Sequence, residues 1–315
     1  MISRRTFVAT ATAAILAAPL SGEAQQAGRV YRVGYLGTRS ASTPEGDRIW
    51  AAFRQGLSEL GWIEGQNLAI ERRSSEGVLG RFPELAAELV RLKVDVITTA
   101  AGWAAVRALK QATTTTPIVM LSIGDPVAGG FVASLARPGG NITGIADLSG
   151  ELTAKRLESL KEILPGIARV AHLVCPVIQE IPANTALRGE QVASAKALGI
   201  SLRFVDVKNS QDFAHASAAV IRERPEALLL GPCPIIFDLR RQIAEFALTH
   251  HLPTVAAHRE AARAGALMSY GSDVAANFRR GAAFVDKILR GAKPADLPVE
   301  QSTTFDVVIN LKTAK

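Results

Sequence analysis

Short runs of aliphatic and β-branched residues alternate with longer amphipathic stretches along the chain from residue 30 onwards. The short runs are typical of buried strands, and the longer stretches are typical of helices with one apolar face. In the first half, strands are predicted at residues 30–36, 67–72, 94–98, 117–121 and 142–146, and helices at 44–60, 81–92, 103–112 and 127–135. Strands and helices in this order form βαβ units around a parallel sheet.

The same alternation restarts after residue 150. Helices are predicted at 152–164, 186–198, 213–222, 237–250 and 274–289, and strands at 169–174, 201–205, 227–230, 254–256, 267–270 and 305–309. A seam near residues 144–150 separates two blocks of similar size. The pattern therefore predicts an α/β fold with two doubly wound parallel-sheet lobes, and a ligand site in the cleft between them.

The first 24 residues have the features of an export signal. Arg4 and Arg5 precede an apolar stretch over residues 7–20, and small residues end the segment at Ala24. The apolar stretch is too short for a membrane span of about 20 residues, so a cleaved signal peptide is predicted rather than an anchor. Paired arginines occur in both twin-arginine and general export signals, so the route stays open. The mature protein is expected in the periplasm.

Composition narrows the possible classes of protein. The chain has 315 residues, 48% of them hydrophobic, a formal net charge of +7, five His and two Cys. The basic residues are spread along the chain, which favours solvated helix faces over a nucleic-acid surface. The His and Cys residues form no metal-binding motif, and phosphate-binding loops and nucleophile elbows are absent, so no metal, no cofactor and no enzymatic activity are expected.

Candidate ligand-binding residues in the first lobe follow its predicted strands. Thr38, Arg39 and Ser40 follow the first strand, where hydroxyls and amides can meet an anion; the alternative is an ordinary polar loop. Asp125 follows the fourth strand, where it suits either a ligand ammonium or a helix N-cap, and we favour the N-cap with exposure to the cleft.

The third strand leads into a helix at Ala101, Gly102 and Trp103. Amides at a helix N-terminus favour a carboxylate, and the indole of Trp103 suits a flat apolar ligand body. The alternative for Trp103 is a residue of the core or of the interface between lobes. This position favours an aromatic carboxylate as ligand.

Candidates in the second lobe also follow strands. Cys175-Pro176 and Cys233 follow strands expected to be neighbours, close enough for a disulfide in an oxidising compartment. Two free thiols near the cleft wall are the expectation, with the disulfide as the alternative. His258 and Tyr270 also follow or end strands and are candidates for ligand contact; the alternatives are a structural histidine and a packed hinge residue.

Several segments together resemble one family. They are FRQGL (53–57), PIV (117–119) with GDPV (124–127), SLARPGGNITG (134–144), LMSYG (267–271), KILRGAKPADLPVEQ (287–301) and VINLKTA (308–314). These segments are similar to the solute-binding proteins of ABC transporters of the tryptophan/tyrosine-type group, which resemble type I periplasmic binding proteins.

This resemblance implies two lobes joined by a multi-strand hinge that close over a small solute, such as an amino acid. It implies a signal peptide at 1–24, an N-terminal lobe of 30–146 plus about 273–296, and a C-terminal lobe of 147–272 plus about 297–315. The implied partner is an ABC permease of the inner membrane, served by a monomeric carrier. A ligand sensor that docks on a membrane receptor is the first alternative, and a secreted α/β enzyme is the second. A repressor with the same lobes is excluded because a signal stands where a helix-turn-helix would be.

Overall fold

The computed structural model describes residues 29–38, 44–148, 150–176, 182–209 and 211–314, and of 44–47 and 182–184 only the backbone. The predicted signal peptide and the candidates Arg39 and Ser40 lie outside the described residues. The fold below is that of the body formed by residues 31–315. No helix in the described part of the chain is both long enough and apolar enough to cross a membrane.

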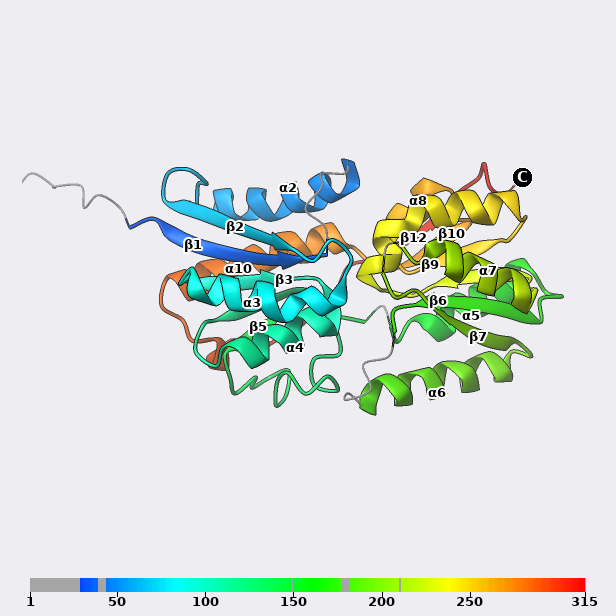
Figure 1. Ribbon diagram of the computed structural model, residues 1–315, viewed down its shortest axis with the longest axis horizontal. Helices are drawn as coiled ribbons and strands as arrows, with labels where there is room; N and C mark the ends of the chain where they lie inside the picture. Colours follow the sequence, from blue (N-terminus) through cyan, green and yellow to red (C-terminus); the bar gives the residue numbers. More distant parts are fainter. Residues whose placement is uncertain (1–28, 39–43, 149, 177–181, 210, 315) are drawn as a thin grey trace, which may run out of the picture. The chain divides into compact units, whose positions relative to one another are not determined.

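The first lobe is built on a parallel sheet with the strand order β11-β5-β4-β3-β1-β2 (Figure 1). Its strands are β1 Tyr31–Gly37, β2 Leu68–Ser74, β3 Val96–Thr99, β4 Ile118–Gly124, β5 Ile142–Asp147 and β11 Glu300–Gln301. Its helices are α2 Pro44–Glu59, α3 Phe82–Arg91, α4 Gly102–Ala112 and α10 Val274–Leu289, with the short η1 Leu79–Arg81 and η2 Pro294–Asp296. Strands β3 and β5 are buried along their whole length, as expected for strands covered on both faces.

Helices cover both faces of this sheet. One apolar core packs α3 and α4 against residues such as Leu36 and Ile97, and the other packs α2 and α10 against Val33 and Val96. Because Val33 and Leu36, like Val96 and Ile97, point to opposite faces of their strands, one short run of sequence supplies both cores.

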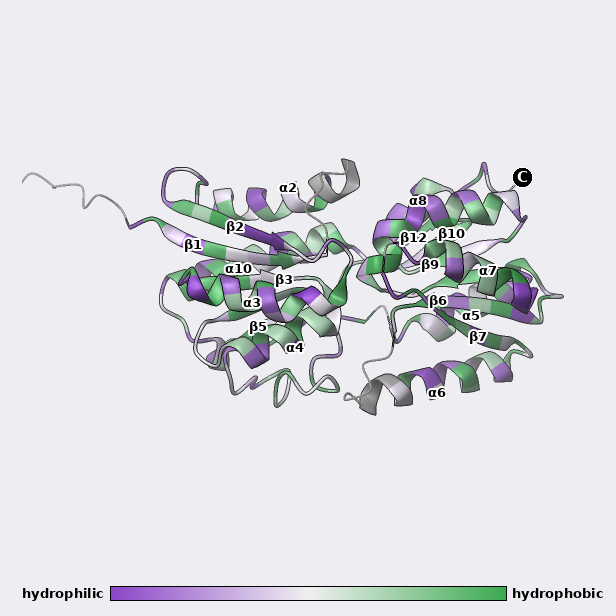
Figure 2. Ribbon diagram, in the orientation of Figure 1, coloured by the Kyte–Doolittle hydropathy of each residue, from purple (hydrophilic) through white to green (hydrophobic). Residues whose placement is uncertain are grey.

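The second lobe repeats the plan with the strand order β12-β10-β9-β8-β6-β7. Its strands are β6 Arg169–Val174, β7 Ser201–Asp206, β8 Ala227–Leu230, β9 Thr254–Ala256, β10 Met268–Ser272 and β12 Phe305–Ile309; its helices are α5 Thr153–Ile163, α6 Pro182–Ala197, α7 Phe213–Glu223, α8 Pro234–Thr249 and α9 Arg259–Ala264. Every strand pairs in parallel except β12, which runs antiparallel to β10. Figure 2 shows hydrophilic residues recurring between hydrophobic ones along α3, α6 and α7. The predicted α/β fold of two doubly wound lobes is confirmed.

The described chain passes between the lobes after β5, after β10 and after β11. Helix α10 returns to the first lobe. Strand β11 pairs with β5 there, although residues from about 297 onwards were expected in the C-terminal lobe. Only β12 then enters the second sheet. These three passages are called the crossing segments below.

One predicted helix is wrong. Residues 127–135 form turns and bends instead, because Gly129 and Gly130 weaken a helix and Gly130 takes a left-handed φ of 68°. Conversely, the short helix α9 was not predicted.

Candidate functional site

A cavity of about 620 Å³ lies between the two lobes, at the carboxyl ends of the strands of both sheets. It is lined by most of the residues expected from sequence: Thr38, Ala101, Gly102, Trp103, Asp125, Cys175, Pro176, Cys233 and His258. Tyr270 does not belong to its lining; its carbonyl oxygen accepts a hydrogen bond of 2.7 Å from Nε of Arg156.

An aromatic and cationic stack forms one wall of the cavity. The rings of Tyr35 and Trp50 lie 4.8 Å apart, and the guanidinium of Arg72 lies 4.5 Å from the Trp50 ring centre and 5.7 Å from that of Tyr35. Burial raises the pKa of the Tyr35 phenol to about 12, against the opposing effect of Arg72. The stack therefore presents flat apolar surface together with a fixed positive charge.

Trp103 lies in the first turn of α4 and contributes a second aromatic surface. Its Nε1 donates a hydrogen bond of 2.9 Å to the carbonyl oxygen of Gly124, and its ring packs edge-on against Phe131 at 6.1 Å. With its polar edge engaged, the indole is held in place at the cavity wall, where it can pack against the body of a ligand.

Two helix N-termini meet at this cavity. The N-cap residues Ala101 of α4 and Cys233 of α8 make no side-chain capping hydrogen bond. A Cβ on Gly102 would lie only 3.5 Å from the ring of Pro234, so the two helix ends are close neighbours. The first amides of a helix lack intrahelical acceptors and carry a partial positive charge, which suits a carboxylate.

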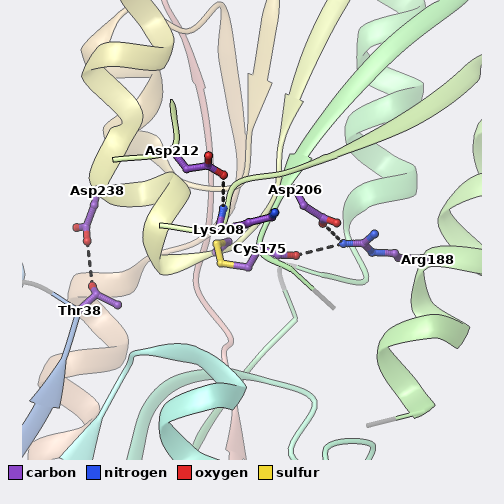
Figure 3. The surroundings of a disulfide bond; sticks show 8 residues. Thr38, Cys175, Arg188, Asp206, Lys208, Asp212 and Asp238 are labelled. Carbon is purple, nitrogen blue, oxygen red and sulfur yellow. Dashed lines mark hydrogen bonds and ion pairs between the residues drawn. A yellow bond between two sulfur atoms is a disulfide. The ribbon is translucent and has the colours of Figure 1, made fainter. Parts of the chain in front are cut away.

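Contacts near the cavity join the lobes directly. Oγ1 of Thr38, after β1, donates to Oδ2 of Asp238 on α8 at 3.0 Å (Figure 3). Nη2 of Arg48 on α2 lies 2.8 Å from Oε1 of Glu260 on α9, whose side chain is 3% exposed. Thr38 thus bridges the lobes instead of belonging to an isolated polar loop.

Carboxylates gather at another part of the lining. Oδ1 of Asp125 accepts from the amides of Val127 and Ala128, so it caps a turn and not the predicted helix. The pKa of Glu151 is raised, mainly by burial and further by the negative charges of Asp125 and Glu190. This part of the cavity therefore favours a positively charged group.

The expectation of two free thiols is wrong, because Cys175 and Cys233 form a disulfide with a Cα–Cα distance of 5.8 Å. Strands β6 and β8 are parallel neighbours in which Leu173 pairs with Leu230, so the chain segments that follow them lie side by side. The carbonyl oxygen of Cys175 also accepts a hydrogen bond from Arg188, which pairs with Asp206 (Figure 3). The disulfide is part of the cavity wall.

Two histidines, the buried His172 and the partly buried His258, line the second lobe's side of the cavity. His258 is the N-cap residue of α9 and packs edge-on against Phe237 at 5.6 Å; burial lowers its pKa. His172 on β6 is 1% exposed, and within the described residues neither of its ring nitrogens has a hydrogen-bond partner. Both imidazoles therefore lie in the cavity wall as neutral groups at pH 7.

Acid is expected to destabilise the protein through His172. Burial, assisted by the charges of Arg156 and Arg188, lowers its pKa from 6.5 to about 3. Below pH 6.5 the unfolded chain binds this proton and the folded chain does not, so stability is full above pH 6.5 and falls as the pH decreases toward 3. When the pH is lowered from 7 to 5, the free energy of unfolding, measured with urea, should fall by about 2 kcal/mol less in a His172→Leu variant than in the wild type. Equal losses would contradict this assignment, and His215→Gln, at an exposed position of α7, is the control.

Several lining residues were missed from sequence: Tyr35, Trp50, Arg72, Asp147 and His172. Trp50 lies within a helix, and Arg72 reaches the site only because β1 pairs with β2 in a register that sets Tyr35 beside it. No group of three or more His, Cys, Asp or Glu able to hold a metal ion occurs among the residues that the structure describes.

A family model of ABC transporter substrate binding proteins matches residues 40–315. The chain belongs to this family. It is therefore a substrate-binding protein and not an enzyme. The chain is 23% identical over 273 residues to the tyrosine-binding protein of Clostridioides difficile strain R20291, a match that covers 86% of this chain and 77% of that protein.

Two solved structures are also similar. A conserved domain protein from Vibrio cholerae has 26% identity and a TM-score of 0.81, and the ABC domain from Streptococcus pneumonia in complex with L-Trp has 24% identity and a TM-score of 0.77. Each match covers 90% of this chain and 93% of the other.

Proposed function

We propose that this substrate-binding protein captures a small organic solute, an amino acid or an aromatic carboxylate, in the cavity between its lobes. One observation carries the proposal: the same cavity holds two aromatic surfaces, a guanidinium and two uncapped helix N-termini. The aromatic surfaces suit a flat apolar body, and the helix ends suit a carboxylate. The names of two relatives, a tyrosine-binding protein and a structure with L-Trp, support the same ligand class.

The solute is then delivered to an ABC permease of the inner membrane. The protein works in the periplasm as a monomer, and the signal features of residues 1–24 support export. A solute that touches both lobes stabilises the closed arrangement only by its extra affinity for that state. The lobes close around the solute by moving about the crossing segments. The closed arrangement is the state that the permease would recognise.

A thermal-shift screen of residues 25–315 tests this proposal. The panel contains the common amino acids, their deaminated aromatic acids, benzoate derivatives, short fatty acids and sugars. A solute that binds only the folded state adds about 2.7 kcal/mol of stability at a hundredfold excess over Kd. We expect a clear rise in Tm with aromatic amino acids or aromatic acids and recovery of the compound unchanged. A rise confined to sugars or fatty acids, or no rise with any compound, would overturn the proposed ligand class.

Trp103 is expected to contribute strongly to affinity for the solute found in the screen. A Trp103→Ala variant removes one aromatic wall and should raise Kd by about 10- to 100-fold, as for other buried aromatic anchors. Trp103→Phe keeps an apolar ring and should retain most of the affinity. Calorimetric titration measures Kd, and far-ultraviolet circular dichroism checks folding. An unchanged Kd for a folded Trp103→Ala protein would remove this residue from the site.

A further inference from the structure

One hydrogen-bond network joins all three crossing segments. Asp147 ends β5, Ser272 ends β10 and Ser302 follows β11, so each lies where the chain leaves one sheet for the other lobe. All three side chains are buried, with exposed fractions of 7%, 3% and 5%. A buried polar network of this kind has a fixed geometry only if its donors and acceptors match.

The donors and acceptors of the network match in one direction only. The two N–H groups of Asn277 donate to Oγ of Ser122 at 3.2 Å and to Oγ of Ser302 at 2.8 Å. The hydroxyl of Ser302 donates a hydrogen bond to the carbonyl oxygen of Ala146 at 3.2 Å, and the hydroxyl of Ser122 donates one to Oδ2 of Asp147 at 2.9 Å. Each hydroxyl has a single proton, so each of these bonds fixes the orientation of the next.

Asp147 is the acceptor on which the Ser122 branch of this network ends. Its Oδ1 accepts a hydrogen bond of 2.7 Å from the hydroxyl of Ser272, so the carboxylate joins the first crossing segment to the second. Through Ser122 and Asn277 it is also joined to the third. A change in the position of this carboxylate would therefore be felt in every segment about which the lobes can move.

The same carboxylate lines the solute cavity. An ionised carboxylate acts only as a hydrogen-bond acceptor, so at this place in the lining it suits a donor group of a solute. Carboxylates outnumber guanidinium groups in the lining, which contains Asp125, Asp147, Glu151, Glu190 and Asp238 beside Arg72 and Arg188. Behind the lining, Asp147 also interacts with the fully buried Arg156, whose pKa burial lowers to about 10. The lining by itself favours a cationic donor.

We propose that Asp147 couples solute binding to lobe closure, by accepting a donor such as the ammonium of the solute while holding the three crossing segments through Ser122 and Ser272. This inference rests on the proposed function of the cavity. It makes Asp147 a residue that touches the solute and Ser272 a positioning residue that acts through it. Solutes that lack a donor at this place would lose part of the coupling.

The test compares variants with matched solutes. L-Tryptophan is paired with 3-(indol-3-yl)propanoate, and L-tyrosine with 3-(4-hydroxyphenyl)propanoate; each second compound lacks only the ammonium. Asp147→Asn should weaken binding of the amino acid by about 10- to 100-fold, which is the cost of losing a charged hydrogen bond. It should weaken binding of the deaminated compound by a smaller factor. Ser272→Ala should weaken both members of a pair by the same factor of about three- to tenfold, because it changes closure and not the contact. Ser217→Ala is the control for the serine change, because the hydroxyl of Ser217 donates to the carbonyl oxygen of Ala214 within α7.

A second measurement separates coupling from a structural role. Small-angle X-ray scattering with and without solute reports lobe closure, and we expect the solute-induced decrease in radius of gyration to be smaller in both variants than in the wild type. If the wild type binds these solutes but Asp147→Asn weakens both members of each pair equally, or if closure is unchanged in folded variants, the coupling is overturned while the proposed function stands. If the wild type binds neither member of either pair, the inference fails, and the proposed ligand class is then decided by the other solutes of the thermal-shift panel.

Discussion

Replacement of Gly144 by alanine is expected to destabilise the protein by about 3 to 4 kcal/mol. Gly144 lies in β5 opposite Met120 of β4, next to a shift in the register of this strand pair. Its φ is 127°, a backbone conformation that residues with a side chain rarely adopt. An added Cβ would lie 2.1 Å from the carbonyl oxygen of Met120. The obstacle is backbone and not a flexible side chain, so one of two central strands has to move.

Two other glycines provide a graded comparison by urea unfolding. Gly61 has a φ of 89° with no atom within 4 Å of an added Cβ, so Gly61→Ala should lose only the conformational cost of about 1 kcal/mol. Gly140 has neither a positive φ nor a close neighbour, and Gly140→Ala should change stability by less than about 0.5 kcal/mol. If Gly144→Ala unfolds at the same urea concentration as Gly61→Ala, the close approach of β5 to Met120 is not the constraint described here.

The fold was predictable because its strands repeat one simple pattern. Runs such as those of β3 and β8 are buried at every position, and the helices between them carry a single apolar face. The prediction of a helix around Gly129 and Gly130 failed because the apolar residues of this segment have helical spacing while its glycines favour turns. Local conformational preference was decisive there, and the hydrophobic pattern was not.

The candidate site was predictable where it depends on strand ends. Ligand sites of open α/β sheets lie beyond the carboxyl ends of strands, and this rule found Thr38, Trp103 and Cys233 in the cavity lining. It did not find Arg72 or Asp147. Arg72 depends on which strand pairs with β1, and Asp147 depends on the meeting of three crossing segments that are far apart in sequence. Such placements follow from tertiary structure, which periodicity along the chain does not specify.

The disulfide was open at the level of sequence for a similar reason. Strands β6 and β8 were expected to be neighbours, and they are. That expectation did not fix the distance between the two cysteines that follow these strands, so free thiols remained compatible with the sequence. In the folded chain their Cα atoms are 5.8 Å apart, within the ordinary range for a disulfide. Because Cys233 is the N-cap residue of α8, the bond also holds that helix end against the strand beside it.

Loss of this disulfide is expected to lower stability by about 4 kcal/mol, since it closes a loop between residues 58 positions apart. The double variant Cys175→Ser, Cys233→Ser should therefore unfold at a lower temperature than the wild type in calorimetry. Dithiothreitol should bring the wild type to the same Tm and leave the double variant unchanged, which separates the cross-link from the polarity of serine. Solute affinity should fall with it, because the bond fixes the α8 end that lines the cavity. A double variant with the Tm of the oxidised wild type would show that packing alone holds these strands together.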